Sequence, residues 1–195
     1  MPTTNNDISD KKVAIVLPIF NTEQYLSDCL ESILSQTHKN FIVFAIDDGS
    51  TDTSSDILES YALKDHRIHP IRTKNSGVSS ARNIALDAIE KHRTFDYISF
   101  IDSDDKFLPD FLETHLSGLV QNNADISICG FAKLYDDNTT QHRDFLPLSC
   151  LTQEQFALLI FSLKDFDRTS SSGGMIWKQI YKASILNGYQ IFNRT

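Results

Sequence analysis

Residues 41–52, FIVFAIDDGSTD, join an apolar run directly to an acidic turn. A short apolar run rich in β-branched and aromatic residues predicts a buried strand. Gly49 suits the turn, and the polar residues 50–52 can cap a following helix. The segment therefore predicts a buried strand whose carboxyl end carries two adjacent carboxylates, Asp47 and Asp48. Turn formation alone does not explain the two carboxylates, and one of them can accept a hydrogen bond from a ligand.

Further apolar runs of this kind occur on both sides of that segment, and helical spacing of apolar residues follows most of them. Strands are predicted at Val13–Pro18, Phe41–Ile46, Ile68–Ile71, Tyr97–Ile101 and Ile126–Cys129. Asn21 is the predicted N-cap of the first helix, with Gln24 completing a capping box and the helix ending near Gln36. Alternating strands and helices predict an α/β fold with a mostly parallel central sheet and helices on both faces.

The alternation ends near residue 130, which divides the chain. Residues 1–12 are predicted to be a loosely held arm, residues 13–130 an α/β half, and residues 131–195 a smaller, irregular α+β segment. Within the last segment, residues 136–138 predict a turn between two irregular strands. Thr152 and Gln155 predict the cap of a helix at Phe156–Leu163, and RTSSSGG at 168–174 predicts a polar loop. Met175–Lys182 and Ala183–Asn187 are predicted to be helical.

Composition excludes several classes of protein. Basic residues number 18 and acidic residues 26, a net charge of −8, so a nucleic-acid partner is not predicted. The three cysteines form no CxxC pair, which fits a reducing, cytoplasmic location. The start of the chain lacks the apolar core of a signal peptide, and no apolar run approaches the ~20 residues of a membrane-spanning helix.

Two further segments follow predicted strands and carry chemistry. Asp102-Ser103-Asp104 places two carboxylates at a strand end, and Mg²⁺ or Mn²⁺ takes such ligands together with phosphate and water. The competing interpretation is a solvated turn that caps the next helix. Gly77 lies among serines before a helix, flanked by Lys74 and Arg82, an arrangement that favours anions. Here the competing interpretation is an ordinary capped helix start.

These motifs, in this order, resemble the family-two glycosyltransferases of the GT-A fold, particularly bacterial enzymes that build surface polysaccharides and lipopolysaccharides. The matching stretches are VAIVLPIFNTEQYLSDCLESILSQTHKNF (13–41), FAIDDGSTD (44–52), KNSGVSSARNIAL (74–86) and YISFIDSDD (97–105). The resemblance extends from about Val13 to Phe192 and implies a Rossmann-like nucleotide-sugar site.

The resemblance also implies roles for individual residues. Pro18, Phe20 and Asn21 would line the base pocket, and Asp48 would hydrogen-bond the base, usually uracil. Residues bordering the nucleotide would be Lys74, Gly77 and Arg82. Asp102 would hold the ribose or the metal, and Asp104 would bind the metal, Mn²⁺ or Mg²⁺, directly. The reaction would be an inverting transfer from a nucleotide-diphosphate sugar, with a UDP-sugar favoured, to a glycan or lipid-linked acceptor.

The carboxyl end departs from the family pattern. In the family, an Ile-x-Phe run is followed by an acidic Glu-Asp pair that supplies the general base. Here the sequence reads Ile191-Phe192-Asn193-Arg194-Thr195, and no acidic residue follows Asp167. We therefore expect the chain to be the N-terminal portion of a longer enzyme, with its base beyond Thr195. Asp165 and Asp167 are poor substitutes because they precede the acceptor-side segment. Any membrane contact would be peripheral, at the inner face of the cell membrane, through the missing part.

Two other classes remain as alternatives. A noncatalytic nucleotide-sugar-binding or interaction domain fits a chain that lacks the base. A phosphoacceptor receiver domain also gathers carboxylates at strand ends, but the first strand here ends in Pro18-Ile19-Phe20-Asn21 rather than an acidic pair.

Overall fold

The structure is a computed structural model that describes residues 7–92, 94–134, 139–143, 150–152, 154–155 and 179–186. Its strands are β1 (Val13–Ile19), β2 (Phe41–Asp47), β3 (Ile68–Arg72), β4 (Tyr97–Phe100), β5 (Ile126–Ile128), β6 (Phe131–Leu134), β7 (Thr140–Arg143) and β8 (Gln179–Lys182). Its helices are α1 (Leu26–Leu34), α2 (Ser54–Lys64), α3 (Val78–His92), α4 (Phe111–Asn122) and α6 (Ala183–Leu186).

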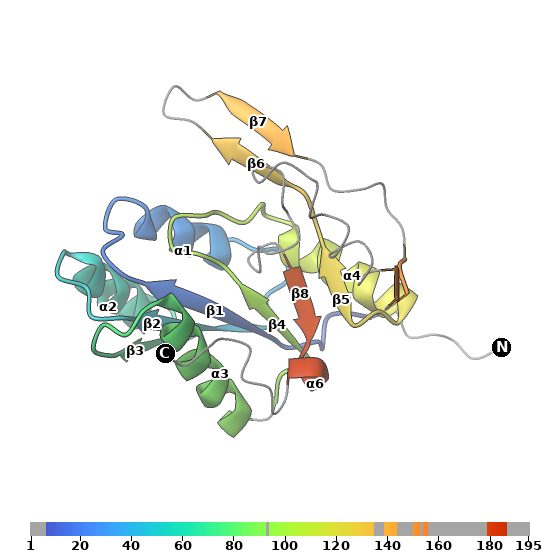
Figure 1. Ribbon diagram of the computed structural model, residues 1–195, viewed down its shortest axis with the longest axis horizontal. Coiled ribbons are helices and arrows are strands. Elements are labelled where there is room, and N and C mark those ends of the chain that lie inside the picture. Colours follow the sequence, from blue (N-terminus) through green and yellow to red (C-terminus); the bar gives the residue numbers. More distant parts are fainter. Residues whose placement is uncertain are drawn as a thin grey trace.

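Six strands form the central sheet in the order β3-β2-β1-β4-β8-β5 (Figure 1). The pairs β1–β2, β2–β3 and β1–β4 are parallel, whereas β8 runs antiparallel to both of its neighbours. The mostly parallel sheet predicted from the sequence is confirmed, with one antiparallel strand inserted near its edge. In Figure 1 the arrow of β1 points to the left, and the β6–β7 ribbon lies above the sheet and apart from it.

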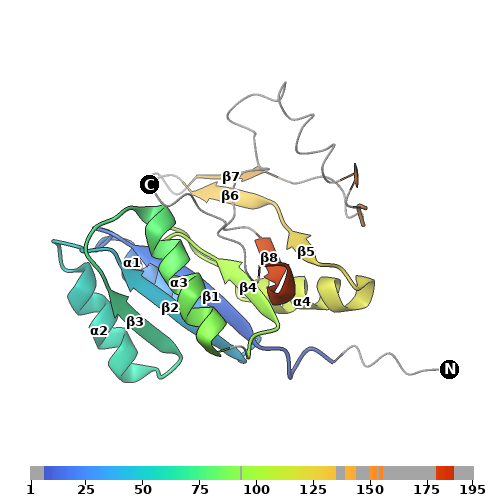
Figure 2. The same cartoon turned by 60° about the horizontal axis from the view of Figure 1, so that its bottom comes forward.

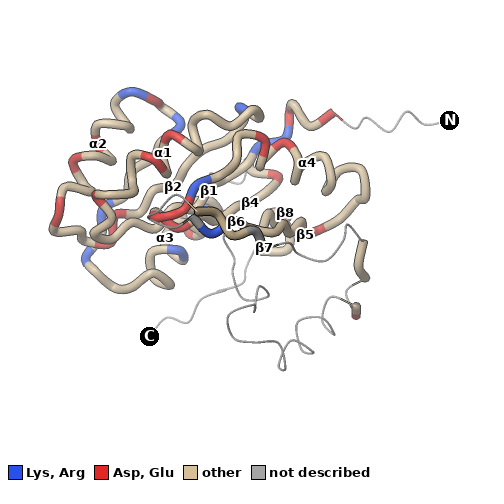
Figure 3. Tube along the Cα trace, turned by 90° about the horizontal axis from the view of Figure 1, so that it is seen from above, with Lys and Arg blue, Asp and Glu red and all other residues tan. Residues whose placement is uncertain are grey.

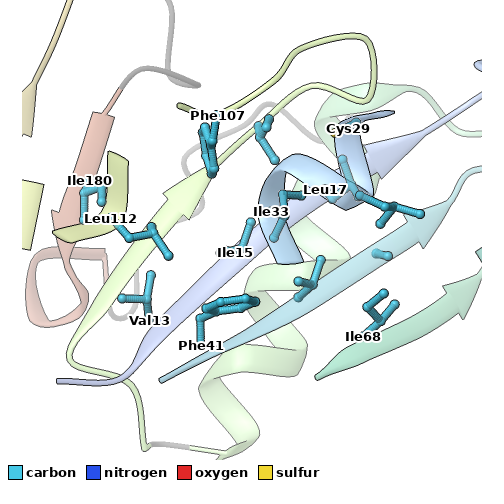
Figure 4. Packing of buried hydrophobic residues seen from close by; sticks show 14 of the residues in the cluster. Val13, Ile15, Leu17, Cys29, Ile33, Phe41, Ile68, Phe107, Leu112 and Ile180 are labelled. Atoms are coloured by element: carbon cyan, nitrogen blue, oxygen red, sulfur yellow. The ribbon is translucent and has the colours of Figure 1, made fainter. Parts of the chain in front are cut away.

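Helices cover both faces of this sheet, because successive side chains of its buried strands point to opposite sides. In β1, Val13, Ile15 and Leu17 pack toward α1, α2 and α4, in the cluster shown in Figure 4. The intervening Ala14 and Val16 pack toward α3 and α6, which lie in front of the sheet in Figure 2. The continuous apolar runs of the sequence are therefore strands that are buried on both faces.

The predicted start of the first helix is wrong. Helix α1 begins at Leu26, and its N-cap Tyr25 makes no side-chain capping bond. Asn21 instead adopts a left-handed backbone conformation with φ 51°, and its Oδ1 accepts a hydrogen bond from the Thr51 backbone N–H at 2.8 Å. The amide side chain of Asn21 is thus used by a distant loop rather than by its own helix.

The predicted helix at Met175–Lys182 is also wrong over its described part. Gln179–Lys182 is β8, which completes two ladders, with β4 on one side and β5 on the other. Ile180 is fully buried in the core, and these long-range contacts decide the conformation of a segment too short to decide it alone. The helical prediction that follows is confirmed at Ala183–Leu186.

Other predictions for the last segment have mixed outcomes. The antiparallel strands β6 and β7 confirm the expected strand pair, whereas the turn at 136–138 lies outside the described residues. Thr152 and Gln155 form the reciprocal bonds of a capping box, each backbone N–H donating to the other's side chain. The helix expected at Phe156–Leu163 and the loop at 168–174 lie outside the described residues. None of the helices described here is long and apolar enough to cross a membrane.

Candidate functional site

A cleft opens where β1, β2 and β4 end. β2 and β3 lie on one side of β1 and β4 lies on the other, so the sheet reverses its order of strand addition between β1 and β4. Ligands of open α/β sheets bind at such a switch point, beyond the carboxyl ends of the strands. The cleft measures about 530 Å³ and is lined by Pro18, Ile19, Phe20, Thr22, Asp48, Asn75, Gly77, Val78, Ala81, Arg82, Asp102, Ser103 and Asp104.

Most of the predicted site residues meet in this cleft. Those that line it are Pro18, Phe20, Asp48, Gly77, Arg82, Asp102 and Asp104, whereas Asn21 and Lys74 lie outside its lining. The lining also includes residues that the sequence did not single out, each adjacent to a predicted one: Ile19, Thr22, Asn75, Val78, Ala81 and Ser103. A second cleft of about 530 Å³, near Ile8 and His38, lies where the strands begin and lacks the acidic strand ends.

The loops after β1 and β2 are fastened to each other by reciprocal hydrogen bonds. The Asn21 backbone N–H donates to Ser50 Oγ at 3.1 Å, and Asn21 Oδ1 accepts from the Thr51 N–H. Glu23 Oε2 accepts from the Thr53 backbone N–H at 3.0 Å and from its hydroxyl at 2.7 Å. These bonds fix the wall of the cleft that carries Phe20, whose side chain is exposed.

Asp48 fastens the loop before α3. Its carboxylate is almost fully buried and accepts hydrogen bonds from Thr73 Oγ1 at 3.1 Å, the Ser76 N–H at 3.0 Å and the Gly77 N–H at 2.8 Å. The Gly77 N–H is therefore already used by Asp48, so Gly77 shapes the cleft rather than offering an anion a donor. Among the residues that the structure describes, Asp48 Oδ2 accepts a hydrogen bond only from the Gly77 N–H, which leaves it one further lone pair.

The neighbouring carboxylate, Asp47, has a structural role. It is buried, and its Oδ1 accepts a hydrogen bond from the Ser50 N–H at 2.9 Å. Its Oδ2 lies 3.5 Å from Nε of Arg72, a side chain that is mostly exposed. Of the two adjacent carboxylates predicted at this strand end, Asp47 therefore shapes the turn and Asp48 reaches the cleft.

The acidic wall of the cleft follows β4. Asp104 is exposed, and Asp102 is partly exposed, with its Oδ1 2.6 Å from Nη2 of Arg82. Burial, together with the charges of Asp104 and Asp102, raises the pKa of the Asp105 carboxyl to about 7. The sequence motifs assign Asp105 no role, and its pKa is raised first by burial and then by the neighbouring carboxylates.

Contacts with α1 hold the loop that follows β4. The Asp102 carbonyl accepts hydrogen bonds from the Asp105 N–H at 3.0 Å and from Cys29 Sγ at 3.7 Å. Burial raises the pKa of the Cys29 thiol well above its ordinary value, so Cys29 stays protonated and acts as a donor. Lys106 forms an ion pair with Asp28 on α1.

Asp102 and Asp104 provide the hard oxygen atoms that Mg²⁺ or Mn²⁺ prefers. Within the part of the chain that the structure describes, no group of three His, Cys, Asp or Glu residues is arranged to hold a metal by itself. A two-carboxylate set fits a cation whose shell is completed by phosphate and water.

Figure 3 shows acidic and basic segments intermixed over the molecule rather than gathered on a single basic face.

Comparison with known proteins identifies the family. Residues 14–185 match the family model described as glycosyl transferase family 2. Glycosyltransferase GlyA of Streptococcus pneumoniae is 40% identical over 119 residues, which cover 61% of this chain and 16% of GlyA. EpsH of Bacillus subtilis, provisionally named a glycosyltransferase, is 30% identical over 181 residues, covering 92% of this chain and 49% of EpsH.

A solved structure shows the same fold. The TarS 1-349 chain of S. aureus, in complex with UDP-GlcNAc, superposes with a TM-score of 0.65 at 21% identity, covering 93% of this chain and 48% of the TarS 1-349 chain. This likeness confirms the expected GT-A fold. The chain spans about half or less of the length of these relatives. From the family match over most of its length, the chain belongs to glycosyl transferase family 2.

Proposed function

We propose that the cleft binds a nucleotide-sugar donor, with a UDP-sugar favoured, and that the protein transfers the sugar to an acceptor hydroxyl. The observation that carries the proposal is the meeting, at one switch point, of an apolar wall with Pro18 and Phe20 and an acidic wall with Asp102 and Asp104. A nucleotide diphosphate has the matching ends, an aromatic base and a strongly charged diphosphate. The UDP-GlcNAc bound to TarS supports the choice of uridine.

The base end of the donor would lie near Phe20, Pro18 and Asp48. Phe20 and Pro18 offer apolar surface against which a base can pack. Asp48 Oδ2 has a lone pair left for an N–H of the base, such as the imide of uracil. Lys74 is exposed outside the lining and would border the nucleotide through its charge alone.

The diphosphate end would lie near Asp104, Asp102 and Arg82. Asp104 would hold Mn²⁺ or Mg²⁺ directly, and Asp102 would share it. When bound there, a divalent cation offsets the negative charge that develops on the departing diphosphate. The acceptor hydroxyl would attack the anomeric carbon from the opposite face and invert it, which requires a carboxylate base within hydrogen-bond reach. The resemblance to family-two enzymes implies an acidic Glu-Asp pair as that base.

The acceptor is proposed to be a glycan or a lipid-linked glycan in cell-surface polysaccharide synthesis. This follows the resemblance to bacterial surface-polysaccharide enzymes. The proposed location is cytoplasmic, with peripheral contact at the inner face of the membrane.

A thermal-unfolding titration with UDP, GDP and CDP, each with and without Mn²⁺, tests the proposal. Ligand at about 100 times its dissociation constant adds ~2.7 kcal/mol to stability, which is about 5–10 °C in midpoint for a chain of this size. We expect UDP to give a shift of this order only with Mn²⁺. No shift with any nucleotide would contradict the proposed donor site.

Replacing Asp104 tests the metal assignment. Asp104→Ala should remove the Mn²⁺ dependence of UDP binding and leave the midpoint without ligand unchanged, because the side chain is exposed and makes no recorded hydrogen bond in the described structure. Asp56→Ala, an exposed acidic residue on α2, is the control and should keep the Mn²⁺ dependence. If UDP binding to Asp104→Ala responds to Mn²⁺ as the parent does, Asp104 does not bind the metal.

A further inference from the structure

The ion pair between Arg82 and Asp102 spans the cleft. Arg82 comes from α3 and Asp102 from the loop after β4, and Nη2 of Arg82 lies 2.6 Å from Oδ1 of Asp102. The two side chains are 13% and 32% exposed, so the pair is partly shielded from water. Charge-assisted hydrogen bonds of this length are about twice as strong as neutral ones.

Both ends of this pair are held in place by the fold. The Asp102 carbonyl is fixed by the Asp105 N–H and by Cys29 Sγ. On the other side, Ala81 and Ala85 pack α3 against the sheet with no exposed surface. The fold therefore holds the backbone of both members, and an exchange of partners would involve their side chains.

We propose that Arg82 holds the carboxylate of Asp102 until a diphosphate arrives, so that the divalent cation and the nucleotide bind as a coupled pair. This inference rests on the proposed function. A cation on Asp102 would have to compete with the guanidinium for the same carboxylate. A diphosphate offers that guanidinium oxygen atoms in the bidentate geometry that arginine prefers. Once Arg82 turns to the diphosphate, Asp102 is released to the cation beside Asp104.

The exchange has a thermodynamic consequence. If the nucleotide removes the competitor of the cation, it raises the affinity of the chain for the cation. By linkage, the cation must raise the affinity for the nucleotide by the same factor. Arg82 is thus a positioning residue whose effect appears in the coupling between two ligands rather than in the affinity for either alone.

The test measures Mn²⁺ binding to the whole chain by electron paramagnetic resonance of free Mn²⁺, with and without UDP. In the parent we expect weak Mn²⁺ binding alone and tighter binding with UDP. Arg82→Gln should bind Mn²⁺ alone about tenfold more tightly, because the competing charged hydrogen bond is gone. The factor by which UDP tightens Mn²⁺ binding should fall by a similar amount. Circular dichroism tests whether Arg82→Gln is folded. If it is unfolded, Arg82→Met, which keeps the aliphatic part of the side chain, is used in its place.

A control ion pair is available away from the cleft. Arg67 pairs with Asp65 at 2.7 Å in the turn before β3, so Arg67→Gln removes another partly buried arginine–aspartate pair. Its Mn²⁺ affinity and its coupling to UDP should equal those of the parent.

The outcomes separate this inference from the proposed function. One outcome would overturn the role of Arg82 and leave the proposed function standing. In it, the Arg82 variants keep the Mn²⁺ affinity and coupling of the parent, and UDP still shifts the midpoint of the parent only with Mn²⁺. Mn²⁺ binding to the parent that UDP does not affect would overturn the role of Arg82 as well. A parent chain that binds neither UDP nor Mn²⁺ would overturn the proposed function and this inference together.

Discussion

Gly49 shows how one residue joins two loops of the cleft. Its φ is +78°, in the left-handed region that side chains rarely adopt. A Cβ at this position would lie 2.8 Å from the Asn75 backbone nitrogen and 3.3 Å from the Thr73 carbonyl oxygen. Those contacts are with backbone, which cannot rotate away. A glycine here therefore permits both the turn after β2 and the close approach of the loop that follows β3.

Gly49→Ala should lower the free energy of unfolding by about 1–3 kcal/mol, the usual range for a strained backbone position. Gly118→Ala is a matched control of opposite sign. Gly118 lies inside α4, and its Cβ would meet nothing within 4 Å, so alanine should stabilise the helix by about 0.5–1 kcal/mol. Urea unfolding of the two variants and the parent measures both changes. Equal changes in both variants would show that the conformation of Gly49 is not the cause.

Asp48 holds the loop before α3 and also lines the cleft. Asp48→Asn would turn an NH₂ group toward the Ser76 or Gly77 backbone N–H, leaving a buried donor without an acceptor. We expect a loss of about 1–3 kcal/mol in stability. If Asp48 also binds the base, UDP affinity should fall by more than the affinity for inorganic pyrophosphate, both measured by calorimetry with Mn²⁺. Equal losses of affinity for UDP and for pyrophosphate would show that Asp48 only holds the loop before α3 in place.

At the scale of the elements, most strands of the central sheet can be predicted from the sequence, but β8 cannot. The runs at Val13–Ile19 and Phe41–Asp47 are long, continuous and buried on both faces, so their composition alone decides their conformation. Gln179–Lys182 is short and has no such run, and its conformation comes from its ladders with β4 and β5. Asn21 shows the same limit at a helix start, because its partner Thr51 lies 30 residues away in the sequence.

The predictability of the site follows the same physical division. Parallel strands must end at one edge, which is why Asp48, Asp102 and Phe20 could be expected to meet. Which side chains pair there depends on the relative positions and orientations of the helices and strands. No local sequence pattern encodes these. The ion pair of Arg82 with Asp102, and the enclosure of Asp48 by the loop before α3, are of this kind.

Helix α4 meets β5 through a buried histidine. His115 Nδ1 lies 2.8 Å from Ser127 Oγ, and its ring lies against Phe111. Burial lowers the pKa of His115 to about 4. The folded chain therefore keeps this ring neutral where the unfolded chain protonates it, near pH 6.5. Stability linked to His115 is full above pH 6.5 and is lost as the pH falls toward 4.

His115→Asn should remove that pH dependence, since asparagine keeps a polar partner for Ser127 and does not titrate. Between pH 8 and pH 5, the parent should lose about 2 kcal/mol more stability than His115→Asn. Urea unfolding at the two pH values gives the comparison. His66→Asn, at an exposed histidine, should behave like the parent. A parallel pH dependence in His115→Asn and the parent would assign the loss to other groups.

At the scale of the whole molecule, the two predicted parts share one sheet. The predicted boundary near residue 130 separates β1–β5 from everything that follows, yet β8 lies between β4 and β5. Ile180, in the middle of β8, is fully buried in the same cluster as Val13 and Leu112 (Figure 4). Residues from 131 onward are therefore needed to close the sheet that carries the cleft.

A chain ending at residue 150 should consequently fail to fold with the stability of the parent. It would leave β4 and β5 without the strand between them and would remove Ile180 from the core. Ile180→Ala alone should cost about 2–5 kcal/mol, whereas Leu63→Ala, at a side chain that is 90% exposed, should cost almost nothing. Since whole domains are stable by only about 5–15 kcal/mol, losing the full strand should abolish cooperative unfolding. Urea unfolding followed by circular dichroism would decide this, and an identical midpoint and slope for the shortened chain would show that residues 1–150 fold without β8.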